Sequence, residues 1–112
     1  MTVASPAPPE ASTEADVGEN ALLGGRVRLL QPARGYRAGM DAALLAAAVP
    51  ARADDRVLEA GCGAGAVLLQ IAARCPGARL TGLERDGVAS ALALRNVALN
   101  AMDDRIEILA GD

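Results

Sequence analysis

Hydrophobic and polar residues follow two different periods along the first half of the chain. In residues 26–31 apolar positions alternate with arginines, a period of two that predicts a half-buried strand. Pro32 follows, and a proline cannot continue a strand ladder. Residues 42–49 are almost wholly apolar and predict a helix, with Asp41 at the expected N-cap position and Pro50 after its end. The pattern of residues 26–50 therefore predicts a strand, a turn and a helix.

The second half alternates short aliphatic runs with helical stretches. The first run has little polar content in its middle, so we expect a strand that is buried on both faces. Short connections predict parallel strands joined by right-handed crossovers, in the order 3-2-1. The fold class is therefore α/β, the first half of a Rossmann-like doubly wound parallel sheet with an N-terminal strand/helix segment. The predicted elements are strands at 54–61, 78–84 and 103–112, and helices at 64–75 and 87–100, the latter capped by Asp86.

A glycine-rich turn joins the first of these strands to its helix. The sequence VLEAGCGAG places Gly61, Gly63 and Gly65 between them. Glycines allow a positive φ and close approach of a ligand to the backbone, and the following helix presents free N–H groups. In doubly wound sheets ligands bind at the carboxyl ends of the strands. The turn is therefore the candidate binding site.

Acidic residues at the strand ends narrow the choice of ligand. Glu59 precedes the first glycine by two residues, and a carboxylate there is unfavourable for a diphosphate but suits a cationic ligand such as S-adenosylmethionine. Glu84 ends the second strand and can accept both ribose hydroxyls, in NAD as well as in S-adenosylmethionine. Asp112 follows the third strand and can meet the amine edge of adenine. In the simpler interpretation these acids bind no ligand and are solvated side chains at strand ends or ordinary turn residues.

Composition divides the 112 residues into three parts and excludes several functions. Residues 1–19 contain Pro, Ala, Ser, Thr and acids, typical of a disordered acidic tail. Residues 20–53 form the strand–turn–helix segment, and residues 54–112 form the ligand-binding part.

The chain has no histidine, and Cys62 and Cys75 lack metal-ligand spacing, so we expect no metal and two reduced thiols. Without a signal-peptide pattern or an apolar run of membrane length, we expect a cytoplasmic location and no membrane partner.

Charge neither requires nor excludes a nucleic-acid partner. The net charge is −3, to which the first 20 residues contribute −4, with four acids and no base, and the rest of the chain +1. Four arginines, Arg26, Arg28, Arg34 and Arg37, lie within a short segment and could track an RNA backbone. A solvated strand face is the more ordinary interpretation of such a run.

Three short motifs together resemble a known family. EAGCGAG at 59–65, LE at 83–84 and AGD at 110–112 resemble motifs one to three of class I S-adenosylmethionine-dependent methyltransferases. Upstream, GGRVRLLQPARGYRAGMDAALLAAAVP resembles the N-terminal segment of the "small domain" group, nearest to the tRNA1(Val) adenine-N6 methyltransferases. The resemblance covers 22–112 and concerns the N-terminal part of the family's domain.

The resemblance implies a role for each matching position. The methionine part of S-adenosylmethionine would be held by the turn and the acid before it, the ribose by the second acid, and the adenine by the residues that follow the last two strands. Asp41 lies in a segment that packs near the cofactor in this family. The implied cofactor-binding residues are Glu59, Gly61, Cys62, Gly63 and Gly65 for methionine, Glu84 for ribose, and Arg85 and Asp112 for adenine.

The family's Asn-Pro-Pro-aromatic motif is absent from the sequence. That motif orients the target amine and stacks on an extruded base, so we expect no catalytic residue here and no methyl transfer by these residues alone. The family domain has seven strands, and the strand at 56–60 would have an open edge available for self-association. The alternatives are a methyltransferase for a protein amide or an rRNA base, a NAD-binding Rossmann fragment, and a non-catalytic truncated product.

Overall fold

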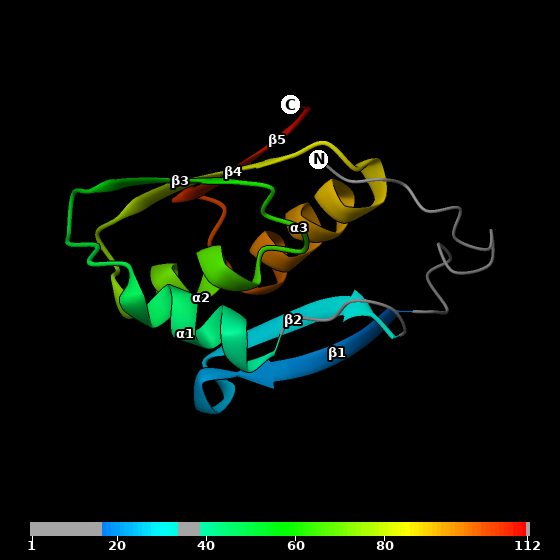
Figure 1. Cartoon of the computed structure of the whole chain (residues 1–112), viewed down its shortest axis with the longest axis horizontal. Helices are drawn as coiled ribbons and strands as arrows, with labels where there is room; N and C mark the ends of the chain where they lie inside the picture. Colours follow the sequence, from blue (N-terminus) through cyan, green and yellow to red (C-terminus); the bar gives the residue numbers. More distant parts are fainter. Residues whose placement is uncertain (1–16, 34–38, 112) are drawn as a thin grey trace.

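A computed structural model describes residues 17–33 and 39–111, which form two sheets and three α-helices (Figure 1). A 3-10 turn, η3 (Leu23–Gly25), joins the first two strands. The strands are β1 (Val17–Leu22), β2 (Val27–Pro32), β3 (Arg56–Ala60), β4 (Arg79–Glu84) and β5 (Ile106–Ala110). The helices are α1 (Met40–Ala48), α2 (Ala66–Arg74) and α3 (Gly87–Leu99).

The main sheet is parallel, with the strand order β3-β4-β5. Its register pairs Glu59 with Gly82, and Gly82 with Ile108. Two successive crossovers of the same hand place α2 and α3 on one face of the sheet, as Figure 1 shows. This arrangement confirms the predicted α/β class and the strand order.

The opposite face of this sheet is open. The expectation that residues 54–61 are buried on both faces is wrong: Leu58 is 68% exposed, and in β3 exposed residues alternate with half-buried ones. Leu109 of β5 points to the same open face and is 45% exposed. The apolar run gives the correct secondary structure, but no described layer covers its outer side.

The N-terminal segment forms a β-hairpin, and its first strand, β1, is an element that the sequence pattern did not predict. β1 pairs antiparallel with β2 from Val17 onward, so residues 17–19 belong to a strand and not to the predicted tail at 1–19. Glu19 explains the error, because its acid looks like tail composition but accepts a 2.6 Å hydrogen bond from Arg28 of β2. Residues 1–16 lie outside the described part of the chain.

The hairpin packs against α3 and α2. Val27 and Leu29 are fully buried between these elements. The side chain of Asn100, at the end of α3, accepts a hydrogen bond from the Arg28 backbone N–H at 2.8 Å and donates one to the Arg28 carbonyl at 2.7 Å. The side-chain amide thus takes the place of a neighbouring strand and fixes the hairpin to the parallel unit.

Helix α1 begins two residues earlier than the sequence suggests. Gly39 is the N-cap and Met40 the first helical residue, so the predicted N-cap, Asp41, lies in the first turn and makes no capping bond. Its carboxylate is still favourably placed near the positive end of the helix dipole. Arg74 of α2 caps the other end by donating to the Ala46 and Val49 carbonyls at 2.9 and 2.7 Å.

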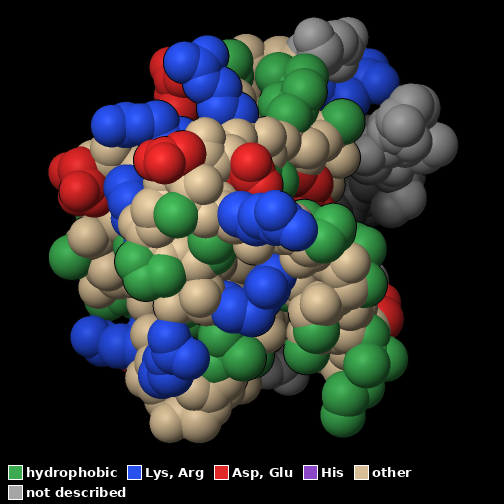
Figure 2. Space-filling view, turned by 90° about the vertical axis from the view of Figure 1, so that its left-hand side faces the viewer, with side chains coloured by type: hydrophobic (Ala, Val, Ile, Leu, Met, Phe, Trp, Pro, Cys, Tyr) green, Lys and Arg blue, Asp and Glu red, His purple; other side chains and the backbone are tan. Residues whose placement is uncertain are grey.

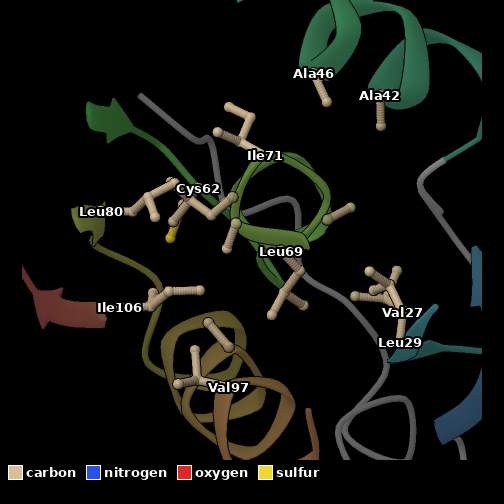
Figure 3. Packing of buried hydrophobic residues seen from close by; sticks show 14 of the residues in the cluster. Val27, Leu29, Ala42, Ala46, Cys62, Leu69, Ile71, Leu80, Val97 and Ile106 are labelled. Carbon is tan, nitrogen blue, oxygen red and sulfur yellow. The ribbon is translucent and has the colours of Figure 1, made fainter. Parts of the chain in front are cut away.

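The core is aliphatic and is centred on α2 (Figure 3). Leu68, Leu69 and Ile71 are at most 1% exposed, and they contact residues from the sheet, α1, α3 and β2. Neither Phe nor Trp is present in the chain, so close packing depends on small and branched side chains.

Candidate functional site

The glycine-rich turn adopts the predicted backbone. Gly61, Gly63 and Gly65 have φ values of 72°, 57° and 96°, all in the left-handed region that favours glycine. The carbonyl of Leu83 in β4 accepts N–H groups from Gly61 and Cys62 at 2.7 and 3.1 Å. The turn is therefore held against the neighbouring strand before α2 begins.

A cavity of about 260 Å³ opens beside this turn, at the carboxyl end of β3. It is bounded by four parts of the chain, namely the end of β2, the start of α1, the turn with the first residues of α2, and the start of α3. The lining residues are Gln31, Pro32, Ala42, Glu59, Gly61, Cys62, Gly63, Ala64, Ala66, Val67, Asp86, Val88, Ala89 and Leu92. Most of them are apolar, and the acidic side chains are those of Glu59 and Asp86.

Glu59 lies in this lining with one oxygen unsatisfied. Its Oε1 is buried and has no hydrogen-bond partner among the described residues. Burial, together with the negative charge of Glu84, raises the pKa of Glu59 to about 7. A buried polar atom without a partner is costly, so this carboxyl group is a natural place for a ligand to supply a donor or a positive charge.

Glu84 connects the two loops at the carboxyl edge of the sheet. It is 7% exposed, and its Oε1 accepts the Gly63 N–H at 2.8 Å while Oε2 accepts the Asp86 N–H at 2.9 Å. The sequence identified this acid as a ribose ligand. Each carboxylate oxygen keeps a further lone pair, so the bracing role and ribose binding are compatible, and ribose binding stays a prediction.

The thiol of Cys62 is buried in the core near Leu80, as Figure 3 shows, and it donates to the Gly63 carbonyl of the turn at 3.7 Å. Burial first, and then the charges of Glu59 and Glu84, raise the pKa of this thiol to about 11. The side chain is therefore protonated and unreactive, and the backbone is the part of Cys62 that can meet a ligand.

Gly82, which sequence reasoning missed, makes room for that thiol. A Cβ at this position would lie 2.6 Å from Leu68 Cδ1 and 2.7 Å from Cys62 Sγ. Gly82 also faces Glu59 across the strand pair. A glycine in the middle of a strand pattern is the signal that could have found it, because it often marks a close approach.

Asn96 is a second residue that the sequence did not reveal. It is fully buried in α3, and its amide donates to the Ala64 carbonyl of the turn at 2.8 Å. It lies one helical turn before Asn100, so the two can act on one face of the helix. An asparagine on a largely apolar helix face was the available signal.

The remaining predicted residues lie at the rim or outside the description. Asp86 is the N-cap of α3, as predicted, and accepts the Ala89 N–H at 2.9 Å. Arg85 is exposed next to Glu84. The side chains of Asp112, Arg34 and Arg37 lie outside the described residues, so the structure does not test their predicted roles.

Neither a cluster of metal ligands nor a membrane-spanning helix occurs among the described residues. No group of three or more His, Cys, Asp or Glu side chains within 17–33 and 39–111 could hold a metal ion. In the same residues, no helix is long and apolar enough to cross a membrane.

The chain matches one protein family and several named relatives. Residues 37–112 match the family described as "Methyltransferase small domain". A relative from Bacteroides fragilis, named tRNA1(Val) (adenine(37)-N6)-methyltransferase, is 37% identical over 76 residues, which are 68% of this chain and 32% of the relative. The chain thus spans about a third of the length of the curated relatives that it matches.

Solved structures share the fold. An S-adenosylmethionine-dependent methyltransferase from Thiobacillus denitrificans, crystallised with S-adenosylhomocysteine, matches with a TM-score of 0.57 and 28% identity over 63% of this chain and 28% of its own. The Pyrococcus horikoshii protein PH0793 matches with a TM-score of 0.73 and 22% identity over 87% of this chain and 37% of its own. The latter likeness concerns the fold alone, and it extends beyond the parallel sheet.

Proposed function

The chain belongs to the methyltransferase small domain family, and on this premise we propose that its cavity at the glycine-rich turn binds S-adenosylmethionine. Membership confirms the resemblance that the sequence motifs suggested. It also confirms the expected cofactor at the level of the family, since matched methyltransferases carry S-adenosylhomocysteine, the demethylated product of that cofactor. The position of the cofactor on these particular residues is our proposal.

The observation that carries this proposal is the unsatisfied oxygen of Glu59 in the cavity lining. A diphosphate brought to this place would add negative charge beside Glu59 and Glu84. S-adenosylmethionine instead brings a sulfonium and an ammonium group, which compensate a carboxylate. The sign of the charge therefore favours this cofactor over a nicotinamide dinucleotide.

Each predicted contact has a place in this proposal. The turn residues Gly61, Cys62, Gly63 and Gly65 hold the methionine part through their backbone, with Glu59 as the counter-charge. Glu84 accepts the ribose hydroxyls with its free lone pairs, and the apolar rim of Val88, Ala89 and Leu92 suits the adenine ring. Arg85 and Asp112 flank that ring from the loops after β4 and β5.

Calorimetric titration of the 112-residue chain tests the binding step. We expect S-adenosylmethionine and S-adenosylhomocysteine to bind and NAD to give no heat above dilution. Retention of NAD with no signal for S-adenosylmethionine would overturn the assignment.

The methyl acceptor is a finer proposal. We propose an adenine N6 atom in tRNA, because the curated relatives that match residues of this chain at 37% identity carry that activity in their name. The Asn-Pro-Pro-aromatic motif is absent from the sequence, so we also propose that these 112 residues hold the cofactor without transferring its methyl group. Adenine methylation of tRNA by the purified chain would contradict this second statement.

The arginines near the hairpin contribute less to RNA binding than their number suggests. Arg26 donates to the Ala73 carbonyl at 2.6 Å, and Arg28 pairs with Glu19. On the face shown in Figure 2, the acidic side chains gather in the upper part, and basic side chains lie both among them and below them. We therefore propose that any RNA contact of this segment rests on Arg34 and Arg37, and charge reversal at these two residues in a complete homologue tests it through tRNA affinity.

We also propose that two of the three predicted parts of the chain act together. Residues 20–53 and 54–112 act as one cofactor-binding unit, because Asn96 and Asn100 join the hairpin to the parallel sheet unit. The first sixteen residues remain the proposed acidic tail, and we propose a cytoplasmic location for the protein.

A further inference from the structure

Two carboxyl groups with opposite environments lie on the same face of the main sheet. Glu84 receives a backbone N–H on each of its oxygens. Glu59 has a buried Oε1 that receives none from the described residues. Since Glu59 pairs in register with Gly82, two residues before Glu84, the two acids are close neighbours on adjacent strands. Two backbone N–H groups thus support the carboxyl group of Glu84, whereas no described residue donates a hydrogen bond to Glu59 Oε1.

The groups that face Glu59 do not relieve this repulsion. Glu84 comes from β4, the Cys62 thiol from the turn, and Asp86 from the loop before α3. No arginine belongs to the described lining of the cavity. Arg34 and Arg37 follow the lining residues Gln31 and Pro32 in sequence but lie outside the described residues. Among the described residues that line the cavity, the charged side chains are therefore those of two acids, Glu59 and Asp86.

Resting on the proposed function, we propose that Glu59 is protonated in the empty cavity near neutral pH and loses this proton to solvent when a cationic group of the cofactor docks on it. Cofactor capture then exchanges one proton for one positive charge. The cation is the ammonium or the sulfonium at the methionine end of S-adenosylmethionine, since both carry the charge that a carboxylate needs.

The direction of the pH effect follows from this exchange. Because burial and Glu84 raise the pKa of Glu59 to about 7, the empty site at pH 6 must release a proton before it binds the cation. At pH 8 the carboxylate is already formed. If only the ionised form binds, affinity rises about tenfold from pH 6 to pH 8, with about 0.9 proton released per ligand at pH 6 and about 0.1 at pH 8.

Calorimetry of the full chain at pH 6, in two buffers with different ionisation enthalpies, counts these protons. The probes are S-adenosylmethionine, S-adenosylhomocysteine and 5′-methylthioadenosine. Proton release with both of the first two assigns the ammonium as the partner, and release with S-adenosylmethionine alone assigns the sulfonium. Methylthioadenosine carries neither cation and should bind without release. Glu59→Gln should abolish the release, whereas Glu107→Gln, an exposed carboxyl on β5, should leave it unchanged.

A second measurement does not depend on the variant. In the chain labelled with ¹³C at glutamate carboxyls, one resonance should titrate near pH 7 in the empty protein and below about pH 5 with S-adenosylmethionine bound. Binding of S-adenosylmethionine without proton release overturns this inference and leaves the proposed function standing. Absence of binding at both pH 6 and pH 8 overturns both.

Discussion

The side chain of Asn96 forms two hydrogen bonds with the backbone of Leu30. Its Oδ1 accepts the Leu30 N–H at 2.7 Å, and its Nδ2 donates to the Leu30 carbonyl at 2.8 Å. The same Nδ2 donates to the Ala64 carbonyl in the glycine-rich turn. One buried amide therefore binds the hairpin strand that leads to Gln31 and Pro32, and also the loop on the other side of the cavity.

Replacing Asn96 should destabilise the chain strongly. Asn96→Ala leaves the backbone groups of Leu30 and Ala64 without partners, and each unsatisfied buried group costs about 1–3 kcal/mol. We expect a loss of about 3 kcal/mol or more in the free energy of unfolding, measured by urea denaturation.

Asn100→Ala is the matched control. It removes the equivalent bonds to Arg28, which is exposed, so water can replace them and the loss should be clearly smaller. Equal effects of the two substitutions would show that the contact with the turn contributes nothing.

Gly82 should tolerate no side chain. Gly82→Ala would place a methyl group 2.6 Å from Leu68 Cδ1 and 2.7 Å from Cys62 Sγ, so the turn or α2 must move. Overpacking of this kind costs about 1–3 kcal/mol. Thermal unfolding followed by circular dichroism should show the loss.

Gly18→Ala in β1 provides the comparison for Gly82. A Cβ there would meet nothing within 4 Å, and its backbone lies outside the positive-φ region. We expect its melting temperature to stay within about 2 °C of the parent chain, as for ordinary surface substitutions. If Gly82→Ala had the same melting temperature as Gly18→Ala, this result would contradict the packing described for Cys62.

Glu59→Gln should stabilise the empty protein at high pH. The pKa of Glu59 is raised to about 7 in the folded chain against an ordinary value of 4.5. The folded state thus holds the proton more tightly, and stability is lost as pH rises through this window. Removing the acid should raise the melting temperature by about 5 °C at pH 8, and by much less at pH 5. A gain of equal size at both pH values would exclude ionisation as its cause.

The sequence was sufficient for features that depend on local pattern. Strand–helix alternation predicted the order β3-β4-β5, and the spacing of Gly61, Gly63 and Gly65 predicted a left-handed turn. Long-range partners were not accessible, because nothing near Asn96 in the sequence points to Leu30, 66 residues away. For the same reason the sequence indicates a tail at Glu19, because it does not show the hydrogen bond to Arg28 on β2.

The open face of the main sheet should make the chain self-associate. Leu58 is 68% exposed on β3, whose outer edge pairs with no described strand, and Leu109 is exposed on the same face. An apolar face beside an unpaired edge favours contact with a second copy. Leu58→Lys should therefore shift the sedimentation profile toward monomer at concentrations where the parent chain associates, and it should leave the melting temperature nearly unchanged. Leu94→Lys, at a leucine of similar exposure (54%) on α3, should have no such effect. If both lysine variants dissociate the chain equally, added net charge is the cause and the sheet face is not the interface.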